Sequence, residues 1–412
     1  MRVLIDYRSA LRKRSGVGEY THQLVKALLA AFPVDAPDRP LELTLFSSSW
    51  KDRPSADGEL AGATTIDRRV PVRLLNLAWH RLAWPPAETI TGRAFDVTHS
   101  LHPLLLPSRA AAHVVTIHDL DFLAHPERTR AEIRRDYPAL ARQHAHRADR
   151  ILVPSRFTAA EVERELGVPG ERISVCSPGA PDWTPREGPA PDAGYVLFFG
   201  TLEPRKNVGA LLDAYERLLG TAKAVPYRDT NAVPYRDSRD SRDANTTSVP
   251  PLVLAGQATA DSQPWLDRIA RPPLRDVVRH VGYVHPSKRR ELYEGARLLV
   301  QPSFEEGFGM PVLEAMTLGI PVVAADRGAL PEVLGDAGLL VDPHAPEQLA
   351  AAIGRLIDDD AFAAVCAAKG PLRARHFRWD LTARRVYDAY QLAIDCRRQR
   401  STGRRAQRTR PA

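Results

Sequence analysis

The sequence predicts an α/β protein of two doubly wound domains, each with a parallel sheet covered by helices. The chain has 412 residues, which fits two domains of about 150 to 200 residues better than one core. Short apolar runs alternate with stretches of helical periodicity, a pattern typical of parallel sheets. The alternation stops in a Pro- and Gly-rich stretch at 176–194 and then restarts, which indicates an interdomain linker.

The apolar runs give the expected strands of each domain. They are 3–5, 43–46, 96–100, 113–119 and 150–155 in the first half, and 195–200, 251–256, 277–284, 296–303 and 321–326 in the second. Helices are expected at 19–32, 208–219, 287–295 and 311–319. We therefore expect the first domain at 1–185 and the second at 186–375, with the ligand site in a cleft between them.

Three segments stand outside this alternation. Residues 221–249 contain AVPYRD twice and SRD twice, a low-complexity composition that predicts a disordered insertion. Residues 376–396 have helical spacing and follow the second sheet, so we expect a helix that packs back on the first domain. Residues 397–412 contain seven arginines and no acid, which is typical of a disordered, solvated tail; binding of this tail to anionic lipid or nucleic acid is the alternative.

The charge and cysteine content favour a cytoplasmic protein that does not bind nucleic acid. The formal net charge is +7, and the arginines of 397–412 account for it, so the rest of the chain is formally neutral. Cys176, Cys366 and Cys396 lack CxxC spacing, which favours a reducing compartment and argues against a structural zinc site. The first ten residues do not resemble a signal peptide, and the sequence lacks an apolar run of ~18 residues.

One segment leaves peripheral contact with the inner membrane surface open. Residues 68–86 combine arginines, Trp79 and Trp84 with apolar residues. Such a segment can lie in a membrane surface near a lipid-linked acceptor. It can also form a helix whose tryptophans pack inside the first domain, and this second interpretation is favoured.

The strongest motif for ligand binding is SFEEGFGMPVLEAMTLGIPVVAAD at 303–326. An expected strand leads into a glycine-rich turn, and a helix begins near Met310 or Pro311, where proline costs no hydrogen bond. Gly307 and Gly309 let a ligand approach the backbone closely. The N–H groups and the dipole of the helix N-terminus then form an anion site.

Two acids flank this anion site. Glu306 precedes the helix and Glu314 lies about one turn inside it. Carboxylates repel phosphate, so we expect them to bind sugar hydroxyls. Two glutamates alone would indicate a capped turn and a solvated side chain. The glycines, Pro311 and the following strand favour a site for a ligand with phosphate and sugar parts.

A second motif places two cations after a buried strand. GTLEPRKN at 200–207 contains Arg205 and Lys206, on a loop at the carboxyl edge of the second sheet, where ligands bind in open α/β folds. Arginine offers a fork to phosphate oxygens and lysine a point charge. Both would stabilise a departing nucleoside diphosphate. An exposed basic turn is the alternative.

Two weaker motifs lie in the first domain. RSGVGEYT at 14–21 contains Gly16 and Gly18 in a turn that opens a helix and can present N–H groups to phosphate. His118 follows the strand in VVTIHDL, where it can donate a hydrogen bond to a sugar or serve a structural role. Asp119 and Asp121 also spell DxD, which we interpret as coincidence.

Together these motifs resemble the retaining glycosyltransferases of family 4, which have the GT-B fold of two facing Rossmann-like domains. The mark of the family is a pair of glutamates separated by seven residues, here Glu306 and Glu314 in EGFGMPVLE. GTLEPRKN, SGVGEYT and His118 occur in the matching order. The resemblance covers nearly the whole chain outside 221–249 and the arginine-rich tail.

The resemblance implies a role for each candidate residue. Glu314 is expected to hold the donor ribose and Glu306 the donor hexose, while Arg205 and Lys206 bind the diphosphate. Gly16 is expected to approach the diphosphate from the first domain, and His118 to lie near the reacting sugar. The remaining donor contacts would come from Gly307, Phe308, Gly309, Met310, Pro311 and Val312 through their backbone, and from Tyr283 and Val284 beside the base.

The implied reaction is hexosyl transfer with retention of configuration, without a metal or cofactor. Arg205 and Lys206 would replace a metal ion on the leaving group. Front-face attack is expected, with the leaving phosphate taking the acceptor proton, and Glu306 as a nucleophile is the alternative. HPLLLPSR, TIHDL and VPSRFT resemble the mannosyltransferase branch that serves polysaccharide assembly. GDP-mannose is therefore the first expected donor, and a glycan or lipid-linked molecule the acceptor.

Two other functions are compatible with this fold. A nucleotide-sugar epimerase of GT-B fold would need no acceptor, and the acid pair in its EGFGMP setting argues against it. A non-catalytic nucleotide-sugar-binding protein would be expected to have a damaged motif, whereas Arg205, Lys206, Glu306 and Glu314 are all present.

Overall fold

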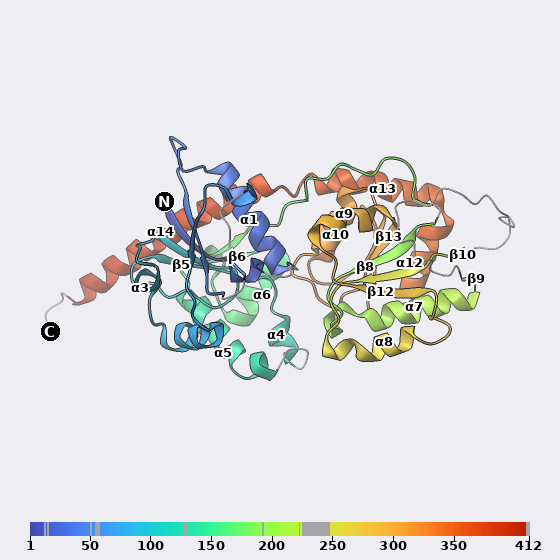
Figure 1. The fold of residues 1–412 in the computed structure, drawn as a ribbon, viewed down its shortest axis with the longest axis horizontal. Coiled ribbons are helices and arrows are strands. Elements are labelled where there is room, and N and C mark those ends of the chain that lie inside the picture. Colours follow the sequence, from blue (N-terminus) through green and yellow to red (C-terminus); the bar gives the residue numbers. More distant parts are fainter. Residues whose placement is uncertain are drawn as a thin grey trace. The chain divides into compact units, whose positions relative to one another are not determined.

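The computed structural model divides into two compact units (Figure 1). Unit 1 comprises Met1–Gly179 with Phe377–Ala412, and unit 2 comprises Ala180–His376. The structure describes residues 1–11, 14, 16–49, 52–53, 58–126, 131–191, 193–221, 223–224 and 248–408.

The boundary between the units lies a few residues before the expected one at 185/186. Unit 2 begins at Ala180. Arg186, with which the second domain was expected to begin, packs within unit 2: its N–H donates to the Leu318 carbonyl at 3.0 Å and its guanidinium Nη1 donates to the Ala296 carbonyl at 2.6 Å. The second half of the expected linker therefore packs on unit 2.

Unit 1 is built on a seven-stranded sheet of order β3-β2-β1-β4-β5-β6-β7. Every neighbouring pair is parallel. The strands are β1 (Arg2–Asp6), β2 (Glu42–Ser47), β3 (Thr64–Asp67), β4 (Val97–Ser100), β5 (Ala112–Thr116), β6 (Arg150–Val153) and β7 (Ile173–Val175). The helices before the C-terminal one are α1 (Val17–Ala31), α2 (Val72–Leu77), the π-helical turn η3 (Ala78–Leu82), α3 (Ala87–Thr91), α4 (Asp121–Ala124), α5 (Ala131–Arg147) and α6 (Arg156–Leu166).

Unit 2 is built on a six-stranded sheet of order β12-β11-β8-β13-β14-β15, again parallel throughout. The strands are β8 (Tyr195–Phe199), β11 (Leu252–Ala255), β12 (Val278–Gly282), β13 (Ala296–Gln301), β14 (Val322–Ala325) and β15 (Leu339–Val341). The helices are α7 (Val208–Thr221), α8 (Gln263–Ile269), α9 (Pro286–Glu294), α10 (Met310–Thr317), α11 (Leu330–Leu334), α12 (Pro346–Asp358) and α13 (Asp360–Ala374). The prediction of two α/β units with parallel sheets is confirmed.

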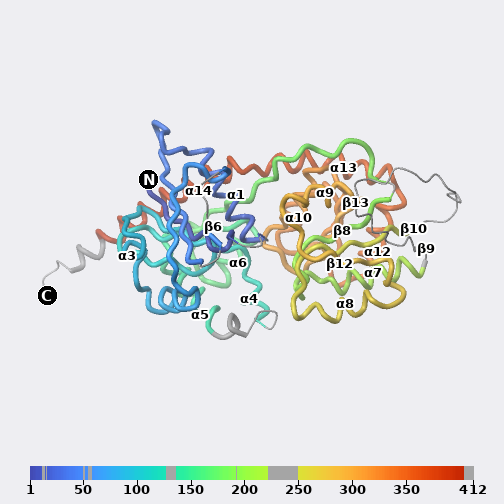
Figure 2. The backbone as a smooth tube through the Cα atoms, viewed as in Figure 1, coloured from blue at the N-terminus to red at the C-terminus, as the bar shows by residue number. Residues whose placement is uncertain are grey.

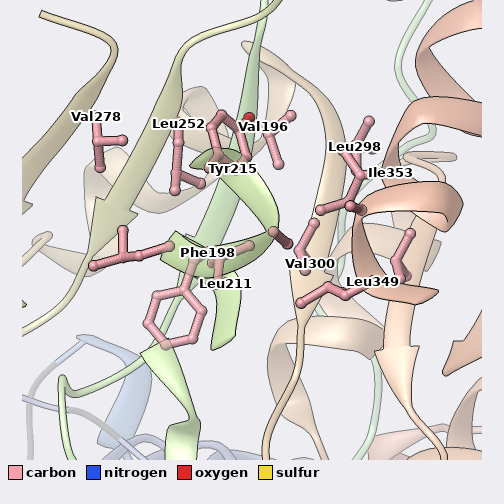
Figure 3. Packing of buried hydrophobic residues seen from close by; sticks show 14 of the residues in the cluster. Val196, Phe198, Leu211, Tyr215, Leu252, Val278, Leu298, Val300, Leu349 and Ile353 are labelled. Carbon is pink, nitrogen blue, oxygen red and sulfur yellow. The ribbon is translucent and has the colours of Figure 1, made fainter. Parts of the chain in front are cut away.

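The core of unit 2 fixes the strands that carry the candidate motifs. Phe198 of β8, Leu252 of β11 and Val300 of β13 are buried in one cluster with side chains of α7 and α12. Figure 3 shows Leu211 and Tyr215 of α7 packed against this sheet. Burial of apolar area on this scale is the main stabilising contribution to such a unit.

The expected insertion at 221–249 is ordered at its ends. Lys223–Ala224 (β9) and Ser248–Val249 (β10) pair as two short parallel strands, and Val249 is buried in the core of unit 2. Residues 222 and 225–247, on which most of this prediction falls, lie outside the described residues.

The C-terminal segment is one helix of 30 residues, α14 (Trp379–Arg408), and it belongs to unit 1. Figure 2 shows it beside α1, and Phe32 at the end of α1 stacks on Tyr387 with ring centroids 4.3 Å apart. The helix continues through residues expected to form a disordered tail. Arginine is a good helix former, and Arg397 and Arg400 pair with the buried carboxylate of Asp149.

Neither α14 nor any other helix in the described part of the chain is long and apolar enough to cross a membrane.

Buried histidines make the stability of unit 1 depend on pH. Burial lowers the pKa of His99 and His113 to about 3 and that of His144 to about 4. These side chains stay neutral in the folded chain at pH values where an unfolded histidine, with a pKa of about 6.5, is protonated. The unfolded state therefore binds more protons below about pH 6.5, and stability falls as the pH drops from there toward 4.

Each such histidine is expected to cost up to about 1.4 kcal/mol per pH unit in this window. Urea unfolding at about pH 7.5 and pH 5.5 measures the effect, and we expect a clearly lower free energy of unfolding at the acidic pH. Replacement of the exposed His146 by glutamine should leave this difference unchanged. Equal stability at the two pH values would contradict the prediction.

Candidate functional site

The two strongest motifs meet at one edge of the unit 2 sheet. β8 and β13 are parallel neighbours, so the loops that follow them emerge side by side where the strand order reverses. The buried amide of Asn207 joins the loops by donating to the carbonyls of Pro302 at 3.1 Å and Pro343 at 2.8 Å. The Arg205 carbonyl accepts the Phe304 N–H at 2.8 Å.

Glu306 is the centre of a buried polar cluster in these loops. Its Oε1 accepts hydrogen bonds from the Lys206 ammonium at 2.5 Å, the Gln301 amide at 2.9 Å and the Ser303 hydroxyl at 2.9 Å. Its Oε2 lies 3.9 Å from Nη1 of Arg205. The structure thus brings the adjacent cations Arg205 and Lys206 together with Glu306, which lies 100 residues after Lys206 in sequence.

The cluster keeps the Glu306 carboxylate charged. Burial alone would raise the pKa of Glu306, but the charges of Lys206 and Arg205 and the hydrogen bonds from Lys206 and Ser303 outweigh it, so the pKa lies below its usual range. A buried pair of this kind is costly to break from one side, because the remaining charge has no partner.

The two cations differ in how far solvent reaches them. The Lys206 side chain is 10% exposed and that of Arg205 22%. Arg205 also donates from Nε to the Glu203 carboxylate at 2.8 Å, which fixes the direction of its guanidinium. Solvent therefore reaches the Arg205 guanidinium more readily than the Lys206 ammonium.

The turn between Glu306 and α10 depends on its glycines. Gly309 has φ 102°, and a Cβ there would lie 2.6 Å from Cδ2 of Leu330. Gly328, in the loop after β14, packs against this turn, and a Cβ there would lie 2.6 Å from the Glu306 carbonyl oxygen. Gly307 and Phe308 are buried, whereas Met310 and Pro311 are partly exposed.

Val312 begins the buried part of α10. The Val312 side chain is fully buried in unit 2, and its N–H donates to the Gly309 carbonyl at 3.0 Å. The amide of Val312 is therefore used within the first turn of α10. The backbone contacts expected from Phe308 to Val312 stay a prediction.

Glu314 lies in a second buried ion pair that the motifs did not reveal. Nη1 of Arg289, on α9, donates to Oε1 of Glu314 at 2.9 Å. The Arg289 guanidinium carbon also lies 5.5 Å from the ring centroid of Phe199, at the end of β8. Burial and then the charge of Glu314 raise the pKa of Tyr293 well above its usual range, which places that phenol near the same carboxylate.

Arg289 carried a weak sequence signal. It stands four residues before Tyr293 in PSKRRELYEG, so the two share a helical face, and both are buried. A run of Lys and Arg is more often a solvated face, and its neighbours Lys288 and Arg290 do pair with exposed acids.

Tyr283 and Val284 follow β12, an edge strand two positions from β8. Both are partly buried. Gly282 before them has φ 72°, and its carbonyl accepts the Gly256 N–H after β11 at 2.8 Å. This hydrogen bond holds the loop at the carboxyl edge of the same sheet.

The first-domain candidates lie at the carboxyl edge of the unit 1 sheet. Gly16, with φ 47°, caps α1, and a Cβ on Gly18 would lie 2.5 Å from the Ser9 carbonyl oxygen. His118 follows β5 and meets the Tyr20 ring edge-on, with centroids 4.9 Å apart. Burial lowers the pKa of His118 to about 4, and its buried Nε2 has no hydrogen-bond partner among the described residues.

Comparison with known proteins identifies both halves of the chain. Residues 14–182 match the model described as Glycosyltransferase Family 4, and residues 193–359 match the model described as Glycosyl transferases group 1. The chain is 30% identical over 400 residues to the O-antigen chain mannosyltransferase B of Escherichia coli, covering 92% of this chain and 96% of that one.

Other relatives match less of the chain. A D-inositol 3-phosphate glycosyltransferase of a Nocardioides species is 33% identical over 58% of this chain and 49% of its own length, so this chain spans about half of that relative.

Solved structures of low identity share the fold. A sucrose-phosphate synthase from Thermosynechococcus elongatus superposes with a TM-score of 0.71 at 20% identity, covering 95% of this chain and 98% of that one. WaaG, a glycosyltransferase involved in lipopolysaccharide biosynthesis, superposes with a TM-score of 0.66 at 14% identity, covering 94% and 99%. The chain therefore belongs to glycosyltransferase family 4 and has the GT-B fold.

Proposed function

We propose that this glycosyltransferase moves a hexose, with mannose from GDP-mannose as the first choice, to a glycan or lipid-linked acceptor in polysaccharide assembly. The observation that carries the proposal is the buried cluster of Arg205, Lys206 and Glu306 beside the α10 turn, a site with cations for a diphosphate and acids for a sugar. The O-antigen mannosyltransferase that matches nearly the whole chain supports the choice of mannose.

Arg205 and Lys206 are proposed to bind the donor diphosphate. The Lys206 ammonium has three N–H donors, so it can keep its bond to Glu306 and still donate to a phosphate oxygen. The Arg205 fork lies closer to solvent and suits two oxygens at once. Together with the backbone amides before Pro311, these groups would stabilise the charge that develops on the leaving group.

Glu306 is proposed to orient the hexose. Its Oε1 already accepts hydrogen bonds from Lys206, Gln301 and Ser303, so Oε2 is the oxygen we assign to a sugar hydroxyl. The lowered pKa of Glu306 makes it a weak base and a weak nucleophile. This property supports front-face attack with retention over a double displacement through Glu306.

Glu314 is proposed to accept hydrogen bonds from the donor ribose, with Arg289 holding its carboxylate in place. Tyr283 and Val284 are proposed to lie beside the base. Gly16 is proposed to approach the diphosphate. His118, neutral at pH 7 because of its lowered pKa, is proposed to use Nε2 to bind a sugar hydroxyl.

A donor screen by thermal shift tests the proposal. Saturation at about 100 times Kd stabilises the native state by about 2.7 kcal/mol, which raises Tm by about 5–10 °C for a domain of about 150–250 residues that unfolds as one unit, the size class of unit 2. We expect the largest shift from GDP-mannose among GDP-, UDP- and ADP-sugars. A larger shift with a UDP- or ADP-sugar would identify that sugar nucleotide as the donor in place of GDP-mannose. No shift with any of them would contradict the donor site.

The proposed reaction uses no metal and no cofactor, because Arg205 and Lys206 neutralise the leaving diphosphate. We expect the transfer rate to be unchanged after treatment with EDTA and gel filtration into metal-free buffer. A rate that falls with EDTA and returns with Mg²⁺ or Mn²⁺ would contradict this part of the proposal. Release of an isomerised free sugar without acceptor would indicate an epimerase.

A further inference from the structure

Gln301 is a polar side chain in the interior of unit 2. It is the last residue of β13, and its side chain is fully buried. Leu298 and Val300 of the same strand lie in the apolar cluster with side chains of α7 and α12 (Figure 3), so the alternation of a strand places Gln301 on the opposite face. Because burial of an amide costs free energy unless new hydrogen bonds replace those to water, its partners show what the side chain is for.

The amide nitrogen of Gln301 binds the Glu306 carboxylate directly and through Ser303. Nε2 donates to Oε1 of Glu306 at 2.9 Å and to the hydroxyl of Ser303 at 3.0 Å. That hydroxyl, which is also fully buried, donates to the same Oε1 at 2.9 Å. An amide N–H and a hydroxyl can both donate, whereas an ionised carboxylate only accepts. The three side chains therefore form one consistently directed set of hydrogen bonds around a charged Glu306.

The oxygen of the same amide is unsatisfied. Oε1 of Gln301 is buried and has no hydrogen-bond partner among the described residues. Turning the amide over would bring this oxygen against the Glu306 carboxylate, so the carboxylate fixes the orientation of the amide. An unsatisfied buried acceptor lowers stability, and a methionine of similar length would not carry it. What glutamine supplies and methionine lacks is the uncharged donor to Glu306, which is present despite the unsatisfied oxygen.

We propose that Gln301 is a positioning residue for Glu306 in sugar transfer. Gln301 and Ser303 hold Oε1 of Glu306 with donors that carry no charge, so a bound diphosphate does not draw them away. Lys206 can then move toward the diphosphate without releasing the carboxylate, and the orientation of Oε2 relative to the hexose is preserved. The inference rests on the proposed function, in which Glu306 orients the hexose and Lys206 binds the diphosphate.

Hydrolysis of GDP-mannose, in which water takes the place of the acceptor, tests the proposal in Gln301→Met. The hexose is less well oriented without the amide donor, so we expect kcat to fall at least about tenfold. Calorimetric titration should give an affinity for GDP within about threefold of the wild-type value, since GDP lacks the hexose. If the thermal shift screen selects another sugar nucleotide, that compound and its diphosphate are used instead. An unchanged kcat, or an equal loss of diphosphate affinity, would overturn the proposal.

A double-mutant cycle shows whether Gln301 acts through Glu306. Glu306→Gln removes the carboxylate that Gln301 holds, so Glu306→Gln/Gln301→Met should be no slower than Glu306→Gln alone. A double variant that is slower by the full factor of Gln301→Met would overturn the proposal. A wild-type kcat in Glu306→Gln would overturn the proposed role of Glu306 and this inference with it, whereas a slow Glu306→Gln beside an unchanged Gln301→Met would overturn the inference alone.

Two further variants separate positioning from stability. Gln263→Met makes the same change at an exposed glutamine of α8, whose amide donates to the Asp267 carboxylate at 2.8 Å, and it should leave kcat unchanged. Gln301→Asn keeps an amide but withdraws it from Glu306 on a shorter side chain, so it should lower kcat as Gln301→Met does. Urea unfolding gives the native fraction of each variant under assay conditions. A wild-type kcat in Gln301→Asn, or a kcat of Gln301→Met that equals the wild-type value per native molecule, would overturn the proposal.

Discussion

Replacement of Lys206 by methionine is expected to lower the transfer rate at least about a hundredfold, the cost typical of removing one donor from the charge that develops in a transition state. Methionine keeps most of the side-chain volume and removes the ammonium. In the folded chain that ammonium lies 2.5 Å from Oε1 of Glu306, where we propose that it also meets the donor diphosphate.

The same change has a cost in stability that must be separated from its effect on catalysis. Without Lys206, the more distant Arg205 is the one cation that still pairs with the buried Glu306 carboxylate among the described residues. Breaking a buried pair from one side costs about 3–5 kcal/mol. Lys206→Met/Glu306→Gln removes both charges and is expected to recover most of this loss. It should nevertheless remain as inactive as the single variant.

Urea unfolding and transfer assays on the wild-type chain and both variants measure these effects. The expected pattern is a stability that falls in the single variant and recovers in the double variant, while activity stays low in both. Recovery of activity along with stability would mean that Lys206 serves the fold and not the donor.

Replacement of Glu314 by alanine is expected to raise the donor KM about 10- to 100-fold. Hydrogen bonds to a charged group contribute about 1.5–3 kcal/mol, and each 1.4 kcal/mol is a factor of ten in affinity. Arg289→Met should act in the same direction, because the guanidinium holds Oε1 of Glu314 at 2.9 Å. Its effect should fall mainly on KM, since neither side chain is proposed to contact the reacting atoms.

Arg290→Met is the matched control for Arg289. Arg290 is the next residue on α9, and it pairs with Glu294 and Thr184 at a more exposed position. Steady-state kinetics with varied donor should show a raised KM for Glu314→Ala and Arg289→Met and an unchanged KM for Arg290→Met. A fall in kcat at constant KM in the Arg289 variant would contradict its role as a positioning residue for the ribose contact.

The sequence was sufficient to predict the sheets because buried parallel strands are nearly continuous apolar runs. The central strands of both units, such as β1, β5, β8 and β13, lie where those runs predicted them. The edge strands β3, β7 and β15 were missed. These strands are short and mostly half-exposed, so their apolar pattern in the sequence is weak. Their pairing is decided by the neighbouring strand.

The candidate site could be predicted only where its functional residues lie close together in the sequence. EGFGMPVLE and GTLEPRKN each identify their residues, and the order of β8 and β13 in the sheet brings them into contact. Arg289 was missed because its partner Glu314 lies 25 residues away on another helix. Gln301 is a polar side chain in the apolar run ARLLVQPS, a signal that could have indicated a buried hydrogen bond.

Tertiary contacts also determine the structure of two segments for which the sequence-based prediction was partly wrong. Arg397 and Arg400 of α14 pair with the carboxylate of Asp149, which lies 251 residues before Arg400 in the sequence. In residues 68–86, Trp79 is buried in the core of unit 1 whereas Trp84 is exposed, and the difference depends on which indole reaches Phe46. Composition and periodicity alone do not give such choices.

The measurement that tests the central claim most directly is calorimetric titration of the nucleoside diphosphate, monophosphate and nucleoside of the donor chosen by the thermal shift screen. If Arg205 and Lys206 bind the diphosphate, the wild-type chain should bind the diphosphate at least about tenfold more tightly than the monophosphate. That difference should largely vanish in Lys206→Met/Glu306→Gln. Equal affinity for the two nucleotides in the wild-type chain, or an undiminished difference in the variant, would contradict the account.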